Sequence, residues 1–267
     1  MNLLEYAPTG FKEHLKALDN TARFNSARIR CELGFSSSHL HYVLTGNEGV
    51  GIPEAVQEIY ERLKGIYGVS EYAYYDAIAM YDFNEGYVSA MADIFKDDTL
   101  ICIGNAERLG MRGHTNNKTG MEELCNKMSG MTNSVVVLTG KNSQLVELVK
   151  GHEKAREWFP YIFRFEDLTP EALFHEMVEY VNSKNYLLDP DTEPALKDYL
   201  NHAYKLRGSN FRNSAYLQEI FDRYIIPKMS ERVMNSNLPP EQLDLCTIMP
   251  EDLPPSTRQI LKWLSKS

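Results

Sequence analysis

The stretch HYVLTGNEGVGIP, residues 41–53, joins an apolar run to a glycine-rich turn and leads into the helix-like sequence EAVQEIYERLKG. Gly46, Gly49 and Gly51 match the glycine skeleton of a phosphate-binding loop, G-x-x-x-x-G-K-[ST]. Ile52 and Pro53 stand where that motif has its lysine and its hydroxyl residue. The stretch therefore predicts a strand, a tight turn and a helix, without the side chains that hold phosphate and magnesium.

Short apolar strands alternate with helices on both sides of this turn. We expect strands at 41–45, 71–77, 100–103, 134–140 and 161–165, and helices at 10–31, 52–66, 88–95 and 121–128. Alternation of this kind favours an α/β fold with a mostly parallel sheet that helices cover on both faces.

The strand signal nearly disappears after residue 167. Three helical segments follow, at 168–185, 191–207 and 214–234, and the first two have a Thr or Asp near the start and a proline in the first turn. Two Pro-Pro pairs then punctuate the C-terminal part. We expect three parts: an α/β core at 1–167, a helical domain at 168–254, and a short terminal helix or tail at 255–267.

The composition disfavours several classes of partner. The formal net charge is -9 and the pI about 5.3, so attraction to nucleic acid or to an anionic membrane is not expected. No apolar run reaches the roughly 20 residues of a spanning helix, and the N-terminus does not look like a signal peptide. We therefore expect a cytoplasmic protein. The four cysteines are scattered and the histidines lack paired spacing, so we expect reduced thiols and no metal site.

Five motifs stand in a suggestive order along the chain. They are HYVLTGNEGVG (41–51), LICIGNAERL (100–109), SVVVLTGKNSQL (134–145), FPYIFRFEDLTPEAL (159–173) and LDLCTIMPEDLP (243–254). In this order they resemble the phosphate-binding loop, the second Walker strand, the sensor-1 strand, the passage into the lid and the end of the lid of an AAA+ ATPase module. The branch that they resemble contains red-type Rubisco activase and sporulation stage V protein K. The resemblance spans nearly the whole chain and implies a P-loop NTPase-like core with a small C-terminal helical lid.

In such a module the loop holds the phosphates with backbone N–H groups, a lysine and a magnesium-binding hydroxyl. The glycines here preserve the bend, whereas Ile52 removes the charge and Pro53 removes both the hydroxyl and one N–H donor. Asn47 and Glu48 complete the loop, and Glu54 follows it. A like charge about 4 Å from a phosphate costs roughly 1 kcal/mol in water. We expect a degenerate nucleotide site that keeps the turn and lacks the groups that bind the ligand.

The second Walker strand shows a parallel loss. The resemblance places Gly104 and Asn105 where active relatives carry the magnesium-binding aspartate and the glutamate that positions water. Glycine has no side chain for a metal, and a neutral asparagine cannot accept a proton from water. Glu107 is a conceivable substitute, although a loop acid on the surface is the simpler interpretation.

An interaction surface is expected instead. Tyr81, Phe83 and Tyr87 occupy the place of a loop that grips polypeptide in active relatives, and core or edge packing is an equally good interpretation of them. Trp158 stands where the resemblance implies an arginine that reaches a neighbouring subunit, and Arg156 lies two residues earlier. The simpler interpretation of Arg156 is a side chain that is exposed to solvent and has no special role.

The preferred hypothesis is a catalytically inactive AAA+-like module, a pseudo-ATPase that acts as a protein-interaction scaffold or adaptor. Its partners would be copies of itself or an active AAA+ relative, and it would need no cofactor. One alternative is an ATP-binding or ATP-hydrolysing protein whose catalytic residues are displaced, with Lys141 or Arg212 entering the site. A weaker alternative is a DNA-associated AAA+-type protein, which the net acidity disfavours.

Overall fold

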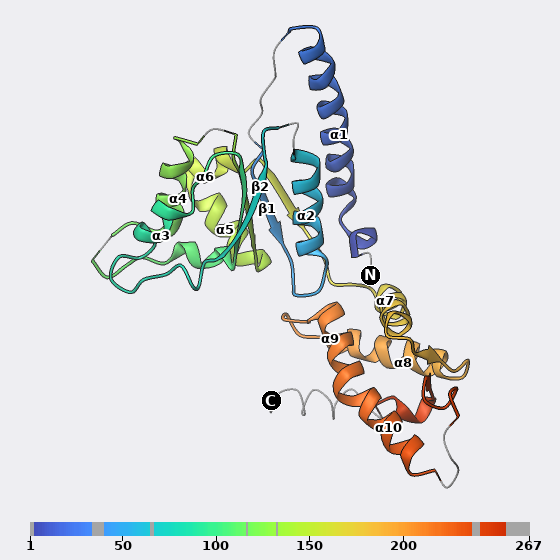
Figure 1. Cartoon of the computed structure of the whole chain (residues 1–267). Helices are drawn as coiled ribbons and strands as arrows, with labels where there is room; N and C mark the ends of the chain where they lie inside the picture. The colour runs from blue at the N-terminus through green and yellow to red at the C-terminus, as the bar shows by residue number, and fades with distance from the viewer. Residues whose placement is uncertain are drawn as a thin grey trace. The chain divides into compact units, whose positions relative to one another are not determined.

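The computed structural model describes residues 3–33, 40–64, 67–115, 117–131, 133–236 and 241–254, without the side chain of Asn142 (Figure 1). Its contacts divide the chain into two compact units. The α/β unit comprises Ala7–Gly46 and Gly51–Glu166, and the helical unit comprises Met1–Tyr6, Asn47–Val50 and Asp167–Ser267. Residues 3–6 and 47–50, which the sequence pattern groups with the core, thus pack with the helices. The tail expected at 255–267 lies outside the described residues.

A parallel five-stranded sheet forms the centre of the α/β unit. Its strands are β1 (Tyr42–Thr45), β2 (Glu71–Asp76), β3 (Thr99–Gly104), β4 (Val135–Gly140) and β5 (Tyr161–Arg164), in the order β2-β3-β4-β1-β5. Every residue of β3 is buried, as a strand covered on both faces should be, whereas β2 lies at the edge and is buried at no position. The predicted parallel sheet is confirmed, and each strand lies within about two residues of its expected range.

Helices cover both faces of this sheet. They are α1 (Thr9–Arg30), α2 (Ile52–Leu63), α3 (Val88–Asp93), α4 (Gly120–Met128), α5 (Asn142–Gly151) and α6 (Glu153–Trp158). In Figure 1, α1 and α2 lie on one side of the sheet and α3 to α6 on the other. The chain moves from β1 to the β2 edge and then back across the sheet, so right-handed crossovers place α2 and the later helices on opposite faces. Helices α5 and α6 were not expected.

The helical unit contains the three predicted helices. They are α7 (Pro170–Ser183), α8 (Thr192–Lys205), and a continuous helix formed by α9 (Asn213–Ile220), a π-helical turn at Phe221–Ile225 and α10 (Ile226–Met234). Pro227 follows the π turn, and because proline has no N–H group, a local change of the hydrogen-bond ladder accommodates it. A short parallel pair, β6 (Leu187–Leu188) and β7 (Thr247–Ile248), was not expected.

A buried ion pair closes the C-terminal part of the helical unit. The Asp252 carboxylate is 1% exposed and accepts hydrogen bonds from Nε and Nη2 of Arg232, at 3.0 and 2.8 Å. Nη2 also donates to the Thr247 carbonyl at 2.9 Å. Removing one partner of a buried pair leaves an uncompensated charge, so this contact fixes where β7 lies against α10.

Candidate functional site

The glycine-rich turn begins where β1 ends. The Gly46 N–H donates to the Gly140 carbonyl at the end of β4, at 3.2 Å, so the turn leaves the sheet at the carboxyl ends of two neighbouring strands. Parallel α/β sheets bind ligands at this edge. Gly51 is buried with φ +95°, a conformation that glycine adopts readily, and it precedes the first residue of α2. The predicted bend is therefore formed.

The N-terminus of α2 presents no cation and no hydroxyl group. Ile52 is half-buried, and Pro53 lies exposed in the first turn, where its missing N–H leaves no helix bond unmade. Glu54 also lies in the first turn, and its Oε2 is buried with no hydrogen-bond partner among the described residues. A carboxylate in the first turn is stabilised by the positive end of the helix dipole. A second anion at this helix terminus would meet a like charge.

The middle of the turn packs as part of the helical unit. Gly49 has φ +76°, and a Cβ atom at this position would lie 2.6 Å from the Arg212 carbonyl oxygen and 2.7 Å from Ser214 Oγ. The Ser214 N–H donates to the Gly49 carbonyl at 3.3 Å. Only glycine permits both this backbone conformation and this approach of two backbones. The first residues of α9 thus fill the space against Gly49.

Arg212 pairs with the carboxylate of Glu48. Its Nε donates to Oε2 at 2.7 Å and its Nη2 to Oε1 at 3.0 Å, while Nη1 donates to Glu219 at 2.7 Å. The hydrogen bond from Arg212 holds the pKa of Glu48 below its ordinary value, and the same bond raises the pKa of Arg212. Both side chains are about half exposed, so the pair contributes at most about 1 kcal/mol. The guanidinium is nevertheless already engaged by two carboxylates.

Asn213 lies at the centre of a buried polar network. Its side-chain oxygen accepts from the Leu168 N–H at 2.9 Å, and its Nδ2 contacts the Glu48 carbonyl at 3.1 Å and Asp167 Oδ1 at 3.0 Å. Asn47 donates to the same Asp167 oxygen at 2.8 Å. Asn213 is fully buried with φ +45°, which asparagine tolerates better than most residues. The network fixes residues 47 and 48 against the start of α7 and α9.

The space beside the end of β3 is occupied by a tyrosine side chain. Gly104 is buried, and a Cβ atom there would overlap the hydroxyl of Tyr74 on the neighbouring strand β2. Asn105 has φ +51° and directs its Nδ2 to both oxygens of Asp76, at 3.2 and 3.1 Å. The space beside Gly104 and the side chain of Asn105 are thus both occupied by contacts within the α/β unit itself.

Glu107 has a structural contact of its own. Its Oε2 accepts the Lys141 N–H at 3.2 Å, and the same oxygen fills the space in which a Cβ of Gly140 would stand. This hydrogen bond joins Glu107 to the end of β4. Lys141 is exposed at the residue before α5.

The aromatic loop after β2 is anchored by two of its three rings. Tyr87 is 1% exposed and donates to the Arg108 carbonyl at 2.9 Å, so it is not part of an accessible surface. Tyr81 donates to the Arg112 carbonyl at 2.8 Å. Phe83 is 68% exposed, and its ring centroid lies 5.6 Å from that of His114.

The two remaining candidates lie on α6. Arg156 is exposed, as a solvated arginine should be. Trp158 is half-buried at the end of the helix, packs against the apolar core of the α/β unit, and its ring centroid lies 5.7 Å from that of His41. Much of the apolar surface of Trp158 is therefore used inside its own unit.

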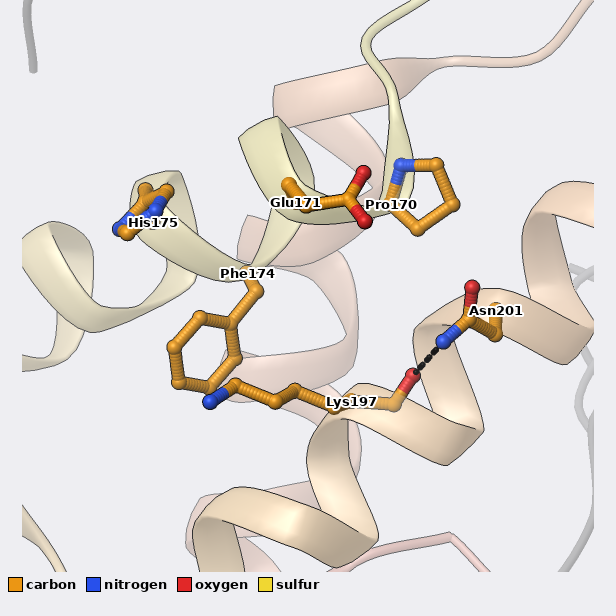
Figure 2. Close-up of a pocket in the computed structure, with 6 residues that line it drawn as sticks. All are labelled: Pro170, Glu171, Phe174, His175, Lys197 and Asn201. Atoms are coloured by element: carbon orange, nitrogen blue, oxygen red, sulfur yellow. Dashed lines mark hydrogen bonds between the residues drawn. The ribbon is translucent and has the colours of Figure 1, made fainter.

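A shallow hollow lies between α7 and α8 of the helical unit. It is lined by Pro170, Glu171, Phe174, His175, Lys197 and Asn201 (Figure 2). The Lys197 ammonium lies 4.3 Å from the centre of the Phe174 ring, and Asn201 donates to the Lys197 carbonyl within α8. None of these residues belongs to the predicted nucleotide site.

The residues predicted to form the nucleotide site therefore divide between the two units. Asn47, Glu48 and Gly49 contact the helical unit, whereas Gly46, Gly51–Pro53 and Gly104–Asn105 belong to the α/β unit. Sequence reasoning missed the parts played by Tyr74, Asp167 and Asn213. The glycine at 104 was the available signal for Tyr74, because a glycine in a buried strand often marks a close approach by another group.

Comparisons with known proteins agree with this architecture. A family model described as the AAA lid domain matches residues 169–262. The structure of a proline-to-glycine mutant of RuvB from Thermotoga maritima is similar over 91% of this chain and 70% of that chain, with a TM-score of 0.54 and 14% identity. A search of curated proteins finds no match. The predicted fold class, an AAA+ α/β core with a C-terminal helical lid, is confirmed. Among the described residues, no helix has the length and apolar character needed to cross a membrane.

Proposed function

We propose that this AAA+ module is catalytically inactive and works by binding other proteins without ATP turnover. The observation that carries the proposal is the Tyr74 hydroxyl, which fills the space at Gly104 where a magnesium-binding carboxylate would stand. A phenol with its proton is a poor magnesium ligand compared with a carboxylate. Hydrolysis needs both the metal and a residue that positions water, and Asn105 is paired with Asp76 instead.

The glycine turn supports the same proposal from the phosphate side. Ile52 and Pro53 provide neither the cation nor the hydroxyl that such loops use, and Glu54 places a carboxylate in the first turn of α2. Within the helical unit, Glu48 supplies an internal anion to Arg212. An arginine that is already paired with a carboxylate gains less from a phosphate than an unpaired one would.

The partners and setting are part of the proposal. A module that has lost its catalytic residues and retains its fold can still act through its surfaces. We therefore infer a scaffold or adaptor that binds copies of itself or an active AAA+ relative. The placement in the branch of red-type Rubisco activase and sporulation stage V protein K, the cytoplasmic setting and the absence of a cofactor belong to the same proposal.

An ATPase assay of the purified full chain with magnesium tests the proposal. We expect phosphate release that does not exceed the buffer control and does not change when Gly51 or Asn105 is substituted. Turnover that either substitution abolishes would contradict the proposal, because both residues would then belong to a working site.

A second candidate is a nucleotide-binding protein with a displaced cation. One contact favours it: the Gly46 N–H to Gly140 carbonyl bond places Lys141 beside the start of the glycine turn. Lys141 is exposed and lies directly after β4. A nucleotide that raises the melting temperature of the wild type but not of Lys141→Ala would establish this candidate.

A further inference from the structure

The outer edge of β2 carries backbone groups that have no strand beside them. β2 is the last strand of the sheet, with β3 on its inner side. The Glu71 and Ala77 N–H groups donate to the Asp98 and Gly104 carbonyls, at 3.2 and 2.9 Å, and both bonds point toward β3. Because backbone groups alternate in direction along a strand, those of Tyr72 and Tyr74 point to the outer side. Among the described residues, no backbone hydrogen bond reaches these groups.

Nothing in the described part of the chain covers this edge. Tyr72 is 42% exposed and Tyr74 is 55% exposed. Proteins usually protect a free edge with charged side chains, lysine above all, with a proline or a bulge, or with a covering helix or loop. The sequence of β2, EYAYYD, contains no proline and no lysine, carries its charges only at its two ends, Glu71 and Asp76, and pairs with β3 in unbroken register. The strand is therefore a ready template for a further strand.

The side chains beside the free edge suit an extended peptide. Tyr72 and Tyr74 project to the same face of the sheet, since side chains two apart on a strand share a face. The Tyr72 ring lies 5.8 Å from the ring of Tyr60 on α2. The Tyr74 hydroxyl leans inward over Gly104 of β3, so apolar side chains of an added strand would meet the exposed outer sides of the two rings, and cross-strand pairs of aromatic and β-branched residues are among the more stabilising pairs in sheets.

The charge at the start of the strand indicates the chemistry of the partner. Glu71 and Asp97 are exposed, and Asp98 accepts the Ser70 and Glu71 N–H groups through its carbonyl, so three acidic residues belong to this end of the strand. Among the described residues, two cations lie near this end, Lys96 and Lys64, whose Nζ is 5.6 Å from the centre of the Tyr60 ring, so the three acidic residues outnumber them by one. A second copy would bring the same acidic end and a net charge of -9, whereas a basic segment would be attracted.

We propose that the outer edge of β2 binds an extended basic segment of another protein as a sixth strand, through the backbone of Tyr72 and Tyr74. Main-chain hydrogen bonds would supply affinity, and the two tyrosines with the acidic end would supply the preference for alternating apolar residues flanked by lysine or arginine. This inference rests on the proposed protein-binding role and names its surface. The ATPase assay tests whether catalysis is lost, and its result does not depend on the edge of β2. The proposed function and this inference can therefore fail separately.

Amide hydrogen exchange of the full chain tests the pairing directly. The probe is a short peptide of alternating valine and threonine with two lysines at each end. We expect saturable binding that slows exchange at the Tyr72 and Tyr74 amides by about tenfold or more, with a smaller change at Ala73 and Tyr75, whose amides already face β3. Absence of binding at millimolar peptide, or protection elsewhere with none at Tyr72 and Tyr74, overturns the proposal.

A pair of variants at one position separates the backbone from the side chain. Tyr74→Pro removes the outward N–H and leaves the bonds to β3 intact, which an edge strand tolerates. Tyr74→Ala removes the same ring and keeps the N–H. We expect Tyr74→Pro to weaken peptide binding by about tenfold or more relative to Tyr74→Ala. Equal binding by the two variants, with both shown to be folded by circular dichroism, contradicts strand addition.

Two further measurements test the choice of occupant. A peptide with glutamates in place of the lysines should bind at least several-fold more weakly at low salt, and equal affinity overturns the basic partner. Sedimentation of the full chain should not reveal a dimer that is lost in the Tyr74→Pro variant. Such a dimer would assign the edge to a second copy of the chain instead.

Discussion

Arg212 and Glu48, 164 positions apart in sequence, form a two-bonded ion pair in which the arginine at the start of α9 engages the carboxylate in the glycine turn. The Arg212 guanidinium is thus already engaged by a carboxylate of the same unit. With the contacts of Asn47, Gly49 and Asn213, the pair holds residues 47–50 within the helical unit.

A double-mutant cycle between Glu48→Gln and Arg212→Gln should give a coupling below about 1 kcal/mol at pH 7, because both groups are about half exposed. The pKa of Glu48 is lowered in the folded protein by the Arg212 hydrogen bond. Its stabilisation is therefore complete above the unfolded-state pKa and is lost as the pH falls through the folded value. Urea unfolding at neutral and acidic pH measures this. A coupling that does not fall in acid would show that charge is not its origin.

Gly49→Ala should destabilise the protein by about 1–3 kcal/mol, since alanine is strained at a positive φ and its Cβ would overlap Arg212 and Ser214. Gly208→Ala is the matched control in the same unit, because a Cβ there meets nothing within 4 Å. Denaturant midpoints measure both. An alanine at 49 that behaves like the one at 208 would contradict the close packing.

Asn213→Ala should cost about 2–4 kcal/mol, because it leaves the buried Leu168 N–H without its partner and removes one of the two donors to Asp167 Oδ1, the other being Asn47. Asn201→Ala on the exposed face of α8, where the side chain only bonds back to its own helix, should cost less than about 1 kcal/mol. Thermal unfolding of the two variants makes the comparison. Equal costs would mean that the network around Asn213 is not a structural centre.

Gly104→Ala should destabilise the α/β unit by about 1–3 kcal/mol, since the added methyl group would overlap the Tyr74 hydroxyl. Combining it with Tyr74→Ala should recover much of that loss relative to Tyr74→Ala alone. Denaturant unfolding of the four proteins gives the coupling. Strictly additive effects would place the Tyr74 ring away from Gly104.

Much of the fold could be predicted because its signals are local. The strands at 41–45, 100–103 and 134–140 are short apolar runs, and the proline beside Thr169 marks the start of α7. Helices α5 and α6 are short, with 10 and 6 residues, so neither gives a long periodic pattern of apolar residues that the sequence alone would reveal.

At the candidate site, the sequence could predict only which binding and catalytic side chains are missing. The missing lysine, hydroxyl and acids can be read at Ile52, Pro53, Gly104 and Asn105. What replaces them depends on contacts between distant segments. The register that pairs Asp76 with Gly104 brings Tyr74 over the glycine, and the packing of residue 49 against 214 brings Arg212 to Glu48. Neither juxtaposition has a signature in local sequence.

The melting temperature of the full chain with and without magnesium ATP or ADP tests the central claim most directly. A ligand at a hundredfold excess over its Kd stabilises the folded state by about 2.7 kcal/mol, a readily measured shift. We predict no shift at millimolar nucleotide, because the turn lacks its cation and hydroxyl and Tyr74 fills the space at Gly104. A saturable, magnesium-dependent rise that a Gly51 substitution abolishes would contradict the account.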